Sequence, residues 1–341
     1  MSDSNQSHLI QLFQPTQYVP MRDCLFKALD KRSILRLAQT SKQVREMVYG
    51  DGALWNINMK LSRFFSNPVA FRSQLALCDA LIAGSFALQF FEQVDWLSSD
   101  IDLYARMGKD VEAMHSYFIK EEGYALAPYH DRILHESDYG GYETTNPHSD
   151  VTEVRTYFKD GETGQLKVQL MSTHGPPCQA VLRNYYMSCI CNFVTWNKAY
   201  SMYPKTTFVD QKTFPLLPLE RRWHDLYRNY FIKYGQRGWT RMVRLPVIEK
   251  PGELFAAAAW RTSGPLWPIQ RKVGDKYSWV MRLETEGVKP STIPDSVIES
   301  SIFEITAPKS RKRGAWWYCK VQADVPASID PKGREEAAFV D

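Results

Sequence analysis

The 341-residue sequence lacks the features of a membrane-spanning, secreted or strongly charged protein. Its longest wholly apolar run, Leu254 to Trp260, is far shorter than a membrane span. Residues 1 to 8 have neither the basic nor the apolar region of a secretory signal. The net charge of +4 is too small to require a nucleic-acid partner. With 44% hydrophobic residues, the composition predicts a soluble globular protein of about two domains and no membrane partner.

Cysteines are few and form no disulfide framework. The six are scattered along the chain, so we expect reduced thiols and a cytoplasmic or nuclear location. His174, Cys178, Cys189 and Cys191 do not have the spacing of a common structural zinc site, and packing is the more typical role of such cysteines. No Gly-x-Ser-x-Gly nucleophile elbow is present either.

One segment carries the chemistry that the rest of the chain lacks. Gly84-Ser85 forms a small-residue turn before a short apolar run, and Ser99-Asp100-Ile101-Asp102-Leu103-Tyr104 follows as a β-type run. Strand alternation would place Asp100 and Asp102 on one face, as a hard divalent cation requires. Peptide N–H groups at the helix start can hold a phosphate. The segment therefore predicts adjacent metal and phosphate sites.

This arrangement resembles the nucleotidyltransferase fold of the polymerase-beta superfamily, whose signature is a Gly-Ser turn followed by Asp-x-Asp on a strand. The resemblance implies that Asp100 and Asp102 are catalytic and ligate Mg²⁺ or Mn²⁺. It also implies that Gly84 and Ser85 bind the phosphates of a nucleoside triphosphate. The gap of 14 residues between Ser85 and Asp100 is slightly long for the pattern.

The third carboxylate that the resemblance implies is replaced. In the best local candidate, residues 166 to 171, Gln169 stands where the acid is expected, and a neutral amide supplies neither charge nor basicity. Lys167 would share its face and could offset phosphate charge, although it cannot ligate a metal. Two alternatives stay open: nucleotidyl transfer to an unknown hydroxyl, and nucleotide binding without chemistry.

The strand pattern around Gln169 predicts a hairpin. Residues 151–158 and 165–171 alternate in polarity and are separated by Asp160-Gly161-Glu162-Thr163-Gly164. One register would put Glu153 on the face of Gln169, where it could replace the missing acid, and a one-residue slip would turn it away. Helices are expected over 109–120 and 179–199, with a long loop over 128–149.

The N-terminal part resembles an F-box, the helical module that docks on the Skp-type adaptor of cullin ubiquitin ligases. Apolar residues recur at helical spacing in short pieces between Pro20 and Val48, with Ser33 and Thr40-Ser41 as expected helix starts. We expect Leu25, Ile34 and Leu37 on the exposed docking face. A small helical cap packed on the next domain explains the same periodicity, and both readings stay open.

The C-terminal part is rich in aromatic and basic residues. Residues 221–244 contain seven Lys or Arg and a single acid, Asp225, interleaved with aromatic residues. Such a mixture can bind nucleotides or single-stranded nucleic acid. Trp223, Tyr227, Tyr230 and Tyr234 nevertheless recur at helical spacing, which favours a buried stripe. The run from Lys309 to Arg313 is typical of a nuclear import signal, a nucleic-acid patch or a solvated loop.

Most of residues 20 to 280 resembles a family of fungal proteins that pair an F-box-like start with a nucleotidyltransferase-like core. The resemblance implies an α+β fold, a nucleotidyltransferase-like mixed sheet with flanking helices, a small N-terminal helical module and an irregular C-terminal extension. It implies no particular reaction. We expect a nucleotide-binding protein, with a non-catalytic ligase substrate adaptor as the alternative. The expected divisions are a disordered tail (1–17), an F-box-like module (18–54), the core (55–212) and an aromatic, basic C-terminal region (213–341).

Overall fold

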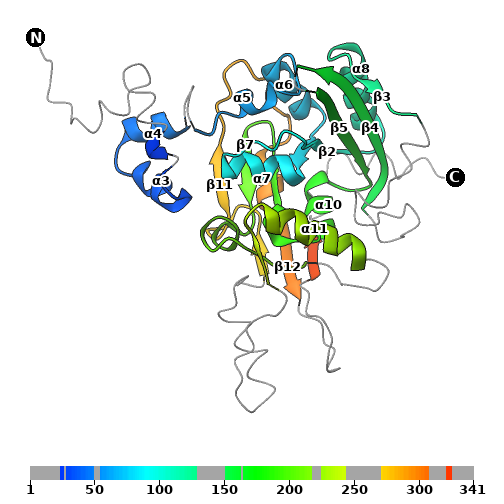
Figure 1. Cartoon of the computed structure of the whole chain (residues 1–341). Coiled ribbons are helices and arrows are strands. Elements are labelled where there is room, and N and C mark those ends of the chain that lie inside the picture. The colour runs from blue at the N-terminus through cyan, green and yellow to red at the C-terminus, as the bar shows by residue number, and fades with distance from the viewer. Residues whose placement is uncertain are drawn as a thin grey trace, which may run out of the picture.

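The computed structural model describes residues 24–26, 28–49, 54–128, 150–162, 164–216, 224–242, 270–306 and 320–324. The expected tail (1–17), nearly all of the expected loop over 128–149 and the basic run from Lys309 lie outside these residues. The described chain is a mixed α+β structure built on a large sheet flanked by helices, as expected (Figure 1). Among its helices, none has both the length and the apolar character that crossing a membrane requires.

The main sheet has eight strands in the order β11-β7-β6-β1-β2-β5-β4-β3. Its pairs are antiparallel except for β2 and β5, which run parallel. Three further strands form a second sheet in the order β10-β12-β13, and β8 pairs with β9. The strands are β1 (Leu81–Ala83), β2 (Ile101–Arg106), β3 (Ala125–Leu126), β4 (Val151–Gly161), β5 (Gly164–Thr173), β6 (Asn192–Val194), β7 (Lys198–Ser201), β8 (Lys212–Thr213), β9 (Thr240–Arg241), β10 (Gln270–Lys272), β11 (Trp279–Arg282), β12 (Ile302–Thr306) and β13 (Lys320–Asp324).

Helices pack against the sheet through large apolar side chains. Phe65 stacks on Phe71 with ring centroids 3.5 Å apart, and it also contacts Phe118, so the helices carrying Phe71 and Phe118 share one core. The helices are α3 (Lys31–Leu37), α4 (Lys42–Tyr49), α5 (Ile57–Leu61), α6 (Pro68–Leu77), α7 (Gly84–Glu92), α8 (Lys109–Lys120), α10 (Pro177–Asn184), α11 (His224–Gln236) and α13 (Asp295–Glu299), with a 3-10 turn at Ser188–Ile190 and a π-helical turn at Lys205–Val209.

Several elements agree with the sequence pattern. The helix expected over 109–120 is α8, and the small-residue turn opens α7 at Gly84. The predicted hairpin is β4–β5, and its ladder continues to a Gly161–Gly164 pair, so the turn is tighter than expected.

The helix expected over 179–199 is wrong beyond Asn184. The chain leaves α10 there and forms β6 and β7, which pair as a hairpin around Trp196-Asn197. Phe193, Val194 and Tyr200 are aromatic or β-branched residues that favour strands, and in this part of the chain pairing within the sheet outweighs helical periodicity.

The N-terminal helices α3 and α4 lie to one side of the sheet (Figure 1). Asp30, rather than the expected Ser33, caps α3 by accepting a hydrogen bond from the Ser33 N–H at 2.7 Å. Ser41 caps α4 as expected, since its Oγ accepts from the Val44 N–H at 3.1 Å. Ile34 is fully buried, so its assignment to an exposed docking face is wrong.

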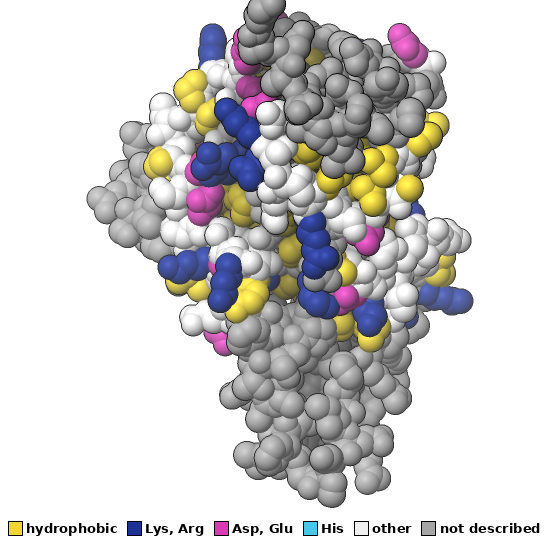
Figure 2. Space-filling view, turned by 90° about the vertical axis from the view of Figure 1, so that its left-hand side faces the viewer, with side chains coloured by type: hydrophobic (Ala, Val, Ile, Leu, Met, Phe, Trp, Pro, Cys, Tyr) yellow, Lys and Arg dark blue, Asp and Glu magenta, His cyan; other side chains and the backbone are white. Residues whose placement is uncertain are grey.

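Two of the three residues expected on the docking face are only partly buried. Leu25 and Leu37 are partly buried and pack against the core. Figure 2, which faces this side of the molecule, shows Lys and Arg in several separate groups with acidic side chains between them. Docking on a Skp-type adaptor stays a prediction, and a variant that tests it needs exposed residues such as Arg36 in place of Ile34.

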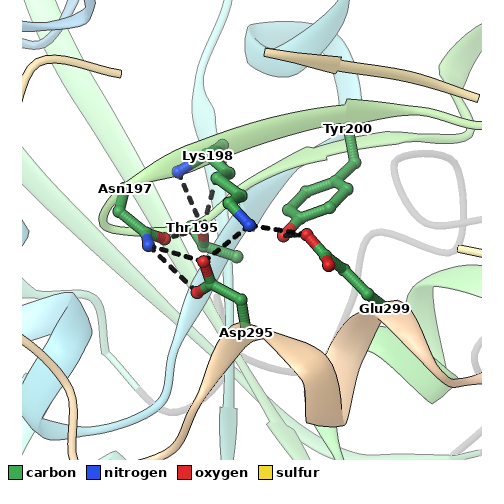
Figure 3. A network of polar contacts seen from close by, with 6 residues as sticks. All are labelled: Thr195, Asn197, Lys198, Tyr200, Asp295 and Glu299. Atoms are coloured by element: carbon green, nitrogen blue, oxygen red, sulfur yellow. Dashed lines mark hydrogen bonds and ion pairs between the residues drawn. The ribbon is translucent and has the colours of Figure 1, made fainter. Parts of the chain in front are cut away.

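Part of the region expected as an irregular extension belongs to the main sheet. β11 pairs with β7 along four residues, and α13 lies beside the β6–β7 hairpin (Figure 3). Lys198 on β7 forms ion pairs with Asp295 at 2.7 Å and Glu299 at 2.6 Å, and Asn197 donates to both Asp295 oxygens. This lysine cluster therefore fixes α13 against the sheet.

A buried arginine ties the same segments together. Arg72 on α6 is 1% exposed, and its guanidinium donates to the carbonyl oxygens of Trp196 and Glu284 and to the Asn58 side chain. Burial lowers the pKa of Arg72 to about 10, with a smaller opposing effect from Glu284. A buried charge needs such hydrogen bonds, so the position of the 284 segment is coupled to α6.

Candidate functional site

The turn at Gly84 places the start of α7 directly against Asp102. Gly84 has a φ of +68°, and a Cβ atom there would overlap Asp102 Oδ2 and lie 3.2 Å from its Cγ. Only glycine meets both conditions without strain. The N-cap residue of α7 is Ala83, whose side chain makes no capping hydrogen bond. The first peptide N–H groups of α7 therefore lie beside a carboxylate, in an environment that also suits anions.

The two aspartates occupy different positions relative to the strand. Asp102 is the second residue of β2 and lies opposite Ala83 on β1 and Gln169 on β5. Asp100 lies just before the strand begins. Ser85 is buried, and its Oγ lies 3.5 Å from Ser99 Oγ, so the turn and the acidic segment are in contact. The structure thus brings together the residues that the sequence predicted to be adjacent.

Gln89, which the sequence analysis did not single out, holds the acidic loop in place. This buried residue of α7 donates to the Ser85 carbonyl at 3.2 Å and accepts from the Trp96 N–H at 2.6 Å. Arg63 adds hydrogen bonds to the carbonyls of Trp96 and Ser99. The loop that leads to Asp100 is therefore fixed to the helix that begins at Gly84. A polar residue within an apolar helical run was the only sequence signal for this role.

Gln169 stands at the position where the resemblance implies a third carboxylate, and among the described residues Glu153 does not replace it. Its side chain is 3% exposed, and its Nε2 donates to Thr156 Oγ1 at 3.4 Å. In the β4–β5 register Thr156, not Glu153, is opposite Gln169. Glu153 instead accepts from Arg155 at 3.0 Å. The expectation that Glu153 replaces the missing acid is therefore wrong, because the observed register turns Glu153 away from the face of Gln169. The ladder is irregular only between residues 151 and 153.

Lys167 pairs with the acidic loop. The parallel register sets Val168 beside Ile101, so Lys167 lies next to Asp100, and its Nζ is 3.4 Å from Asp100 Oδ2. The Lys167 and Asp100 side chains are 27% and 25% exposed, which leaves the pair only partly screened by water. The positive charge of Lys167 therefore compensates the negative charge of Asp100.

Aromatic residues and one arginine cover the same region. Tyr234 on α11 is buried, and burial followed by nearby charges that include Asp102 raises its pKa well above the usual value. The Arg237 guanidinium lies 3.8 Å from the centroid of the Trp96 ring. Burial lowers the pKa of Arg237, and Tyr234 and Asp100 partly oppose this effect. These two residues lie within electrostatic range of the aspartates.

The stripe on α11 agrees with the interpretation that the sequence favoured. Tyr230 and Tyr234 are buried, and Tyr230 stacks on Tyr186 with centroids 4.1 Å apart. Trp223 and the side chain of Tyr227 lie outside the described residues. The sequence singled out Arg237 only as part of a basic stretch. Its proximity to Asp100 depends on how α11 packs, which no local pattern encodes.

The fit to a metal is partial. Within the described ranges, no three His, Cys, Asp or Glu side chains are grouped so as to hold an ion. Asp100 and Asp102 supply hard oxygen ligands, and Mg²⁺ commonly takes one or two carboxylates together with water and phosphate oxygens. The residues therefore suit one Mg²⁺ held jointly with a nucleotide better than two metals held by protein.

The three cysteines near His174 in the sequence are buried. Cys178 contacts Ser301 Oγ at 3.8 Å, and burial raises its pKa to about 11. Burial raises the pKa of Cys189 and of Cys191 to about 12. His174 is exposed. These environments suit packing of neutral thiols, since a metal ligand needs the thiolate.

No family model, curated protein or solved structure matches the chain, so the chemistry of this site is inferred from its own residues.

Proposed function

We propose that the protein binds a nucleoside triphosphate together with one Mg²⁺ at the start of α7. The observation that carries the proposal is the contact between Gly84 and Asp102, which sets a helix N-terminus and a carboxylate side by side. Helix N-termini bind phosphate oxygens, and Mg²⁺ bridges carboxylates and phosphates. Asp100 is the second candidate ligand, and Ser85 lies in the first turn.

The same residues argue against efficient nucleotidyl transfer. In a two-metal reaction, acidic ligands hold both ions, and a base near the acceptor hydroxyl activates it. Gln169 is neutral and donates a hydrogen bond to Thr156, so it supplies neither a charged metal ligand nor a base. When Mg²⁺ is bound, it would neutralise phosphate charge. The described residues of the site would bind and orient the triphosphate, and Gln169 would not deprotonate an acceptor.

Equilibrium binding of a fluorescent ATP analogue tests the proposal. The full chain is titrated with and without Mg²⁺, beside Asp102→Asn, which keeps the shape of the side chain and removes its charge. Asp160→Asn, an exposed carboxylate in the hairpin, is the matched control. We expect Asp102→Asn to weaken Mg²⁺-dependent binding about tenfold or more, equivalent to about 1.4 kcal/mol.

Two results would contradict the proposal: absence of binding to the unmodified protein, or equal binding by Asp102→Asn. Label transfer from labelled triphosphates separately tests the expectation that the protein does not catalyse efficient nucleotidyl transfer. If the unmodified protein transfers label to an acceptor and the Asp100→Asn, Asp102→Asn double variant does not, the site is an active transferase despite Gln169.

A further inference from the structure

Lys167 places a positive charge beside Asp100, one of the two candidate metal ligands. Its Nζ lies 3.4 Å from Asp100 Oδ2, and the β2–β5 ladder sets this proximity, because the backbones of residues 101 and 168 are partners. A charged ammonium and a divalent cation compete for the same carboxylate, since each is attracted by its negative charge.

Two carboxylates and two cations belong to the described part of the candidate site. Asp100 pairs with Lys167 and lies within electrostatic range of the Arg237 guanidinium, and Asp102 lies two residues further along, in β2. A divalent metal alone would leave an excess of positive charge in this partly buried place. A triphosphate alone would leave an excess of negative charge beside two carboxylates. Each ligand should therefore bind weakly without the other.

Arg237 shows that a donor is available for an anion. Its buried Nη1 has no hydrogen-bond partner among the described residues, although its guanidinium is held over Trp96. A buried unsatisfied donor is costly, and an anionic oxygen would satisfy it. The long, flexible side chain of Lys167 can likewise turn from a carboxylate to a phosphate.

From these observations, and resting on the proposed nucleotide binding, we infer that Lys167 is a built-in counter-ion that couples metal binding to nucleotide binding. Without ligand it neutralises Asp100 and keeps the metal affinity low. An arriving triphosphate attracts the ammonium group, and Asp100 is then released to ligate the metal. Because coupling between two ligands is reciprocal, the metal raises nucleotide affinity by the same factor.

The test measures Mn²⁺ binding by electron paramagnetic resonance, with and without a non-hydrolysable ATP analogue. The proteins are the unmodified full chain, Lys167→Met, Lys167→Arg and a control, Lys159→Met. Lys159 lies on the neighbouring strand β4, 3.8 Å from the buried Glu122, so its loss removes the same charge elsewhere on the sheet. Thermal unfolding verifies that each variant is folded.

We expect Lys167→Met to bind Mn²⁺ alone about tenfold more tightly and the coupling factor to fall about tenfold below that of the unmodified chain, which leaves the coupling that direct metal–phosphate contact supplies. Lys167→Arg retains the coupling, and Lys159→Met changes neither quantity. Unchanged Mn²⁺ affinity or undiminished coupling in Lys167→Met would overturn the counter-ion role while leaving nucleotide binding intact. Failure of the unmodified chain to bind the analogue at any Mn²⁺ concentration would instead overturn the proposed function, and the coupling with it.

Discussion

Replacing Gly84 with alanine should damage both the stability of the fold and the candidate site. The added methyl group meets a backbone φ of +68° and overlaps Asp102 Oδ2. Gly123 provides a matched control because its φ is +70° and an added Cβ there meets nothing within 4 Å. The two substitutions share the same backbone strain and differ in the contact with the carboxylate.

The shared strain amounts to roughly 1–2 kcal/mol, the cost of a left-handed conformation for a residue with a Cβ. Only Gly84→Ala also forces Asp102 away from the start of α7. A carboxylate at a helix N-terminus contributes up to about 2 kcal/mol in a partly buried site. We therefore expect Gly84→Ala to lower the free energy of unfolding by about 1–2 kcal/mol more than Gly123→Ala, as measured by urea denaturation. It should also weaken Mg²⁺-dependent nucleotide binding about tenfold or more, and Gly123→Ala should not.

The reasoning fails if the two variants lose the same stability. It fails separately if Gly84→Ala is the less stable variant yet binds Mg²⁺ and nucleotide as the unmodified chain does, because Asp102 would then be positioned without the turn.

Three further outcomes follow from the described contacts. Lys198→Met should lower the free energy of unfolding by about 2 kcal/mol, which lies between the typical contributions of exposed and buried ion pairs. Lys205→Met removes a largely exposed ion pair and should lower the free energy of unfolding by less than about 0.5 kcal/mol. Burial lowers the pKa of Lys198, but its carboxylate partners on α13 raise it above 10.5 overall. The difference in free energy of unfolding between the unmodified chain and Lys198→Met should therefore be full below pH 10 and shrink as the pH rises through the raised pKa. A difference in urea denaturation that stays constant with pH would refute this. Gln169→Glu should strengthen Mn²⁺ binding but destabilise the metal-free protein by about 1–3 kcal/mol, because a buried carboxylate lacks compensation there; equal stability without metal would contradict it. A thiol reagent at pH 8 should modify exposed Cys24 but leave Cys189 unmodified until the chain unfolds, as mass spectrometry would show, and equal labelling of both in the folded protein would disprove the burial argument.

The parts of the fold that the sequence predicted are those that local patterns encode. Helix α8 has a clear amphipathic period, α7 opens at a glycine, and the hairpin β4–β5 alternates around a turn. The side-by-side placement of Gly84 and Asp102 was also expected. It follows because β2, which the chain reaches through α7, pairs antiparallel with β1 and sets Asp102 opposite Ala83.

The parts that escaped prediction depend on partners far away in the sequence. Thr156 rather than Glu153 faces Gln169 because the ladder runs in one register from the Gly161–Gly164 pair at the turn, whereas the alternation of residue types fits both registers. The Lys167–Asp100 pair requires parallel pairing of β2 with β5, which no local pattern specifies. Tertiary packing likewise brings Arg237 to Trp96.

The strand β11 has a consequence for how the chain folds. It covers the outer edge of β7, and the Arg72–Glu284 hydrogen bond joins residues 212 positions apart. During synthesis the ribosome must therefore deliver residues beyond 279 before the sheet can be completed, so folding should be slow and late. Until then β7 presents unpaired backbone groups, which are a template for association with other chains. A chain truncated after residue 212 would keep Gly84, Asp100 and Asp102, yet we expect it to aggregate rather than to fold as an independent core.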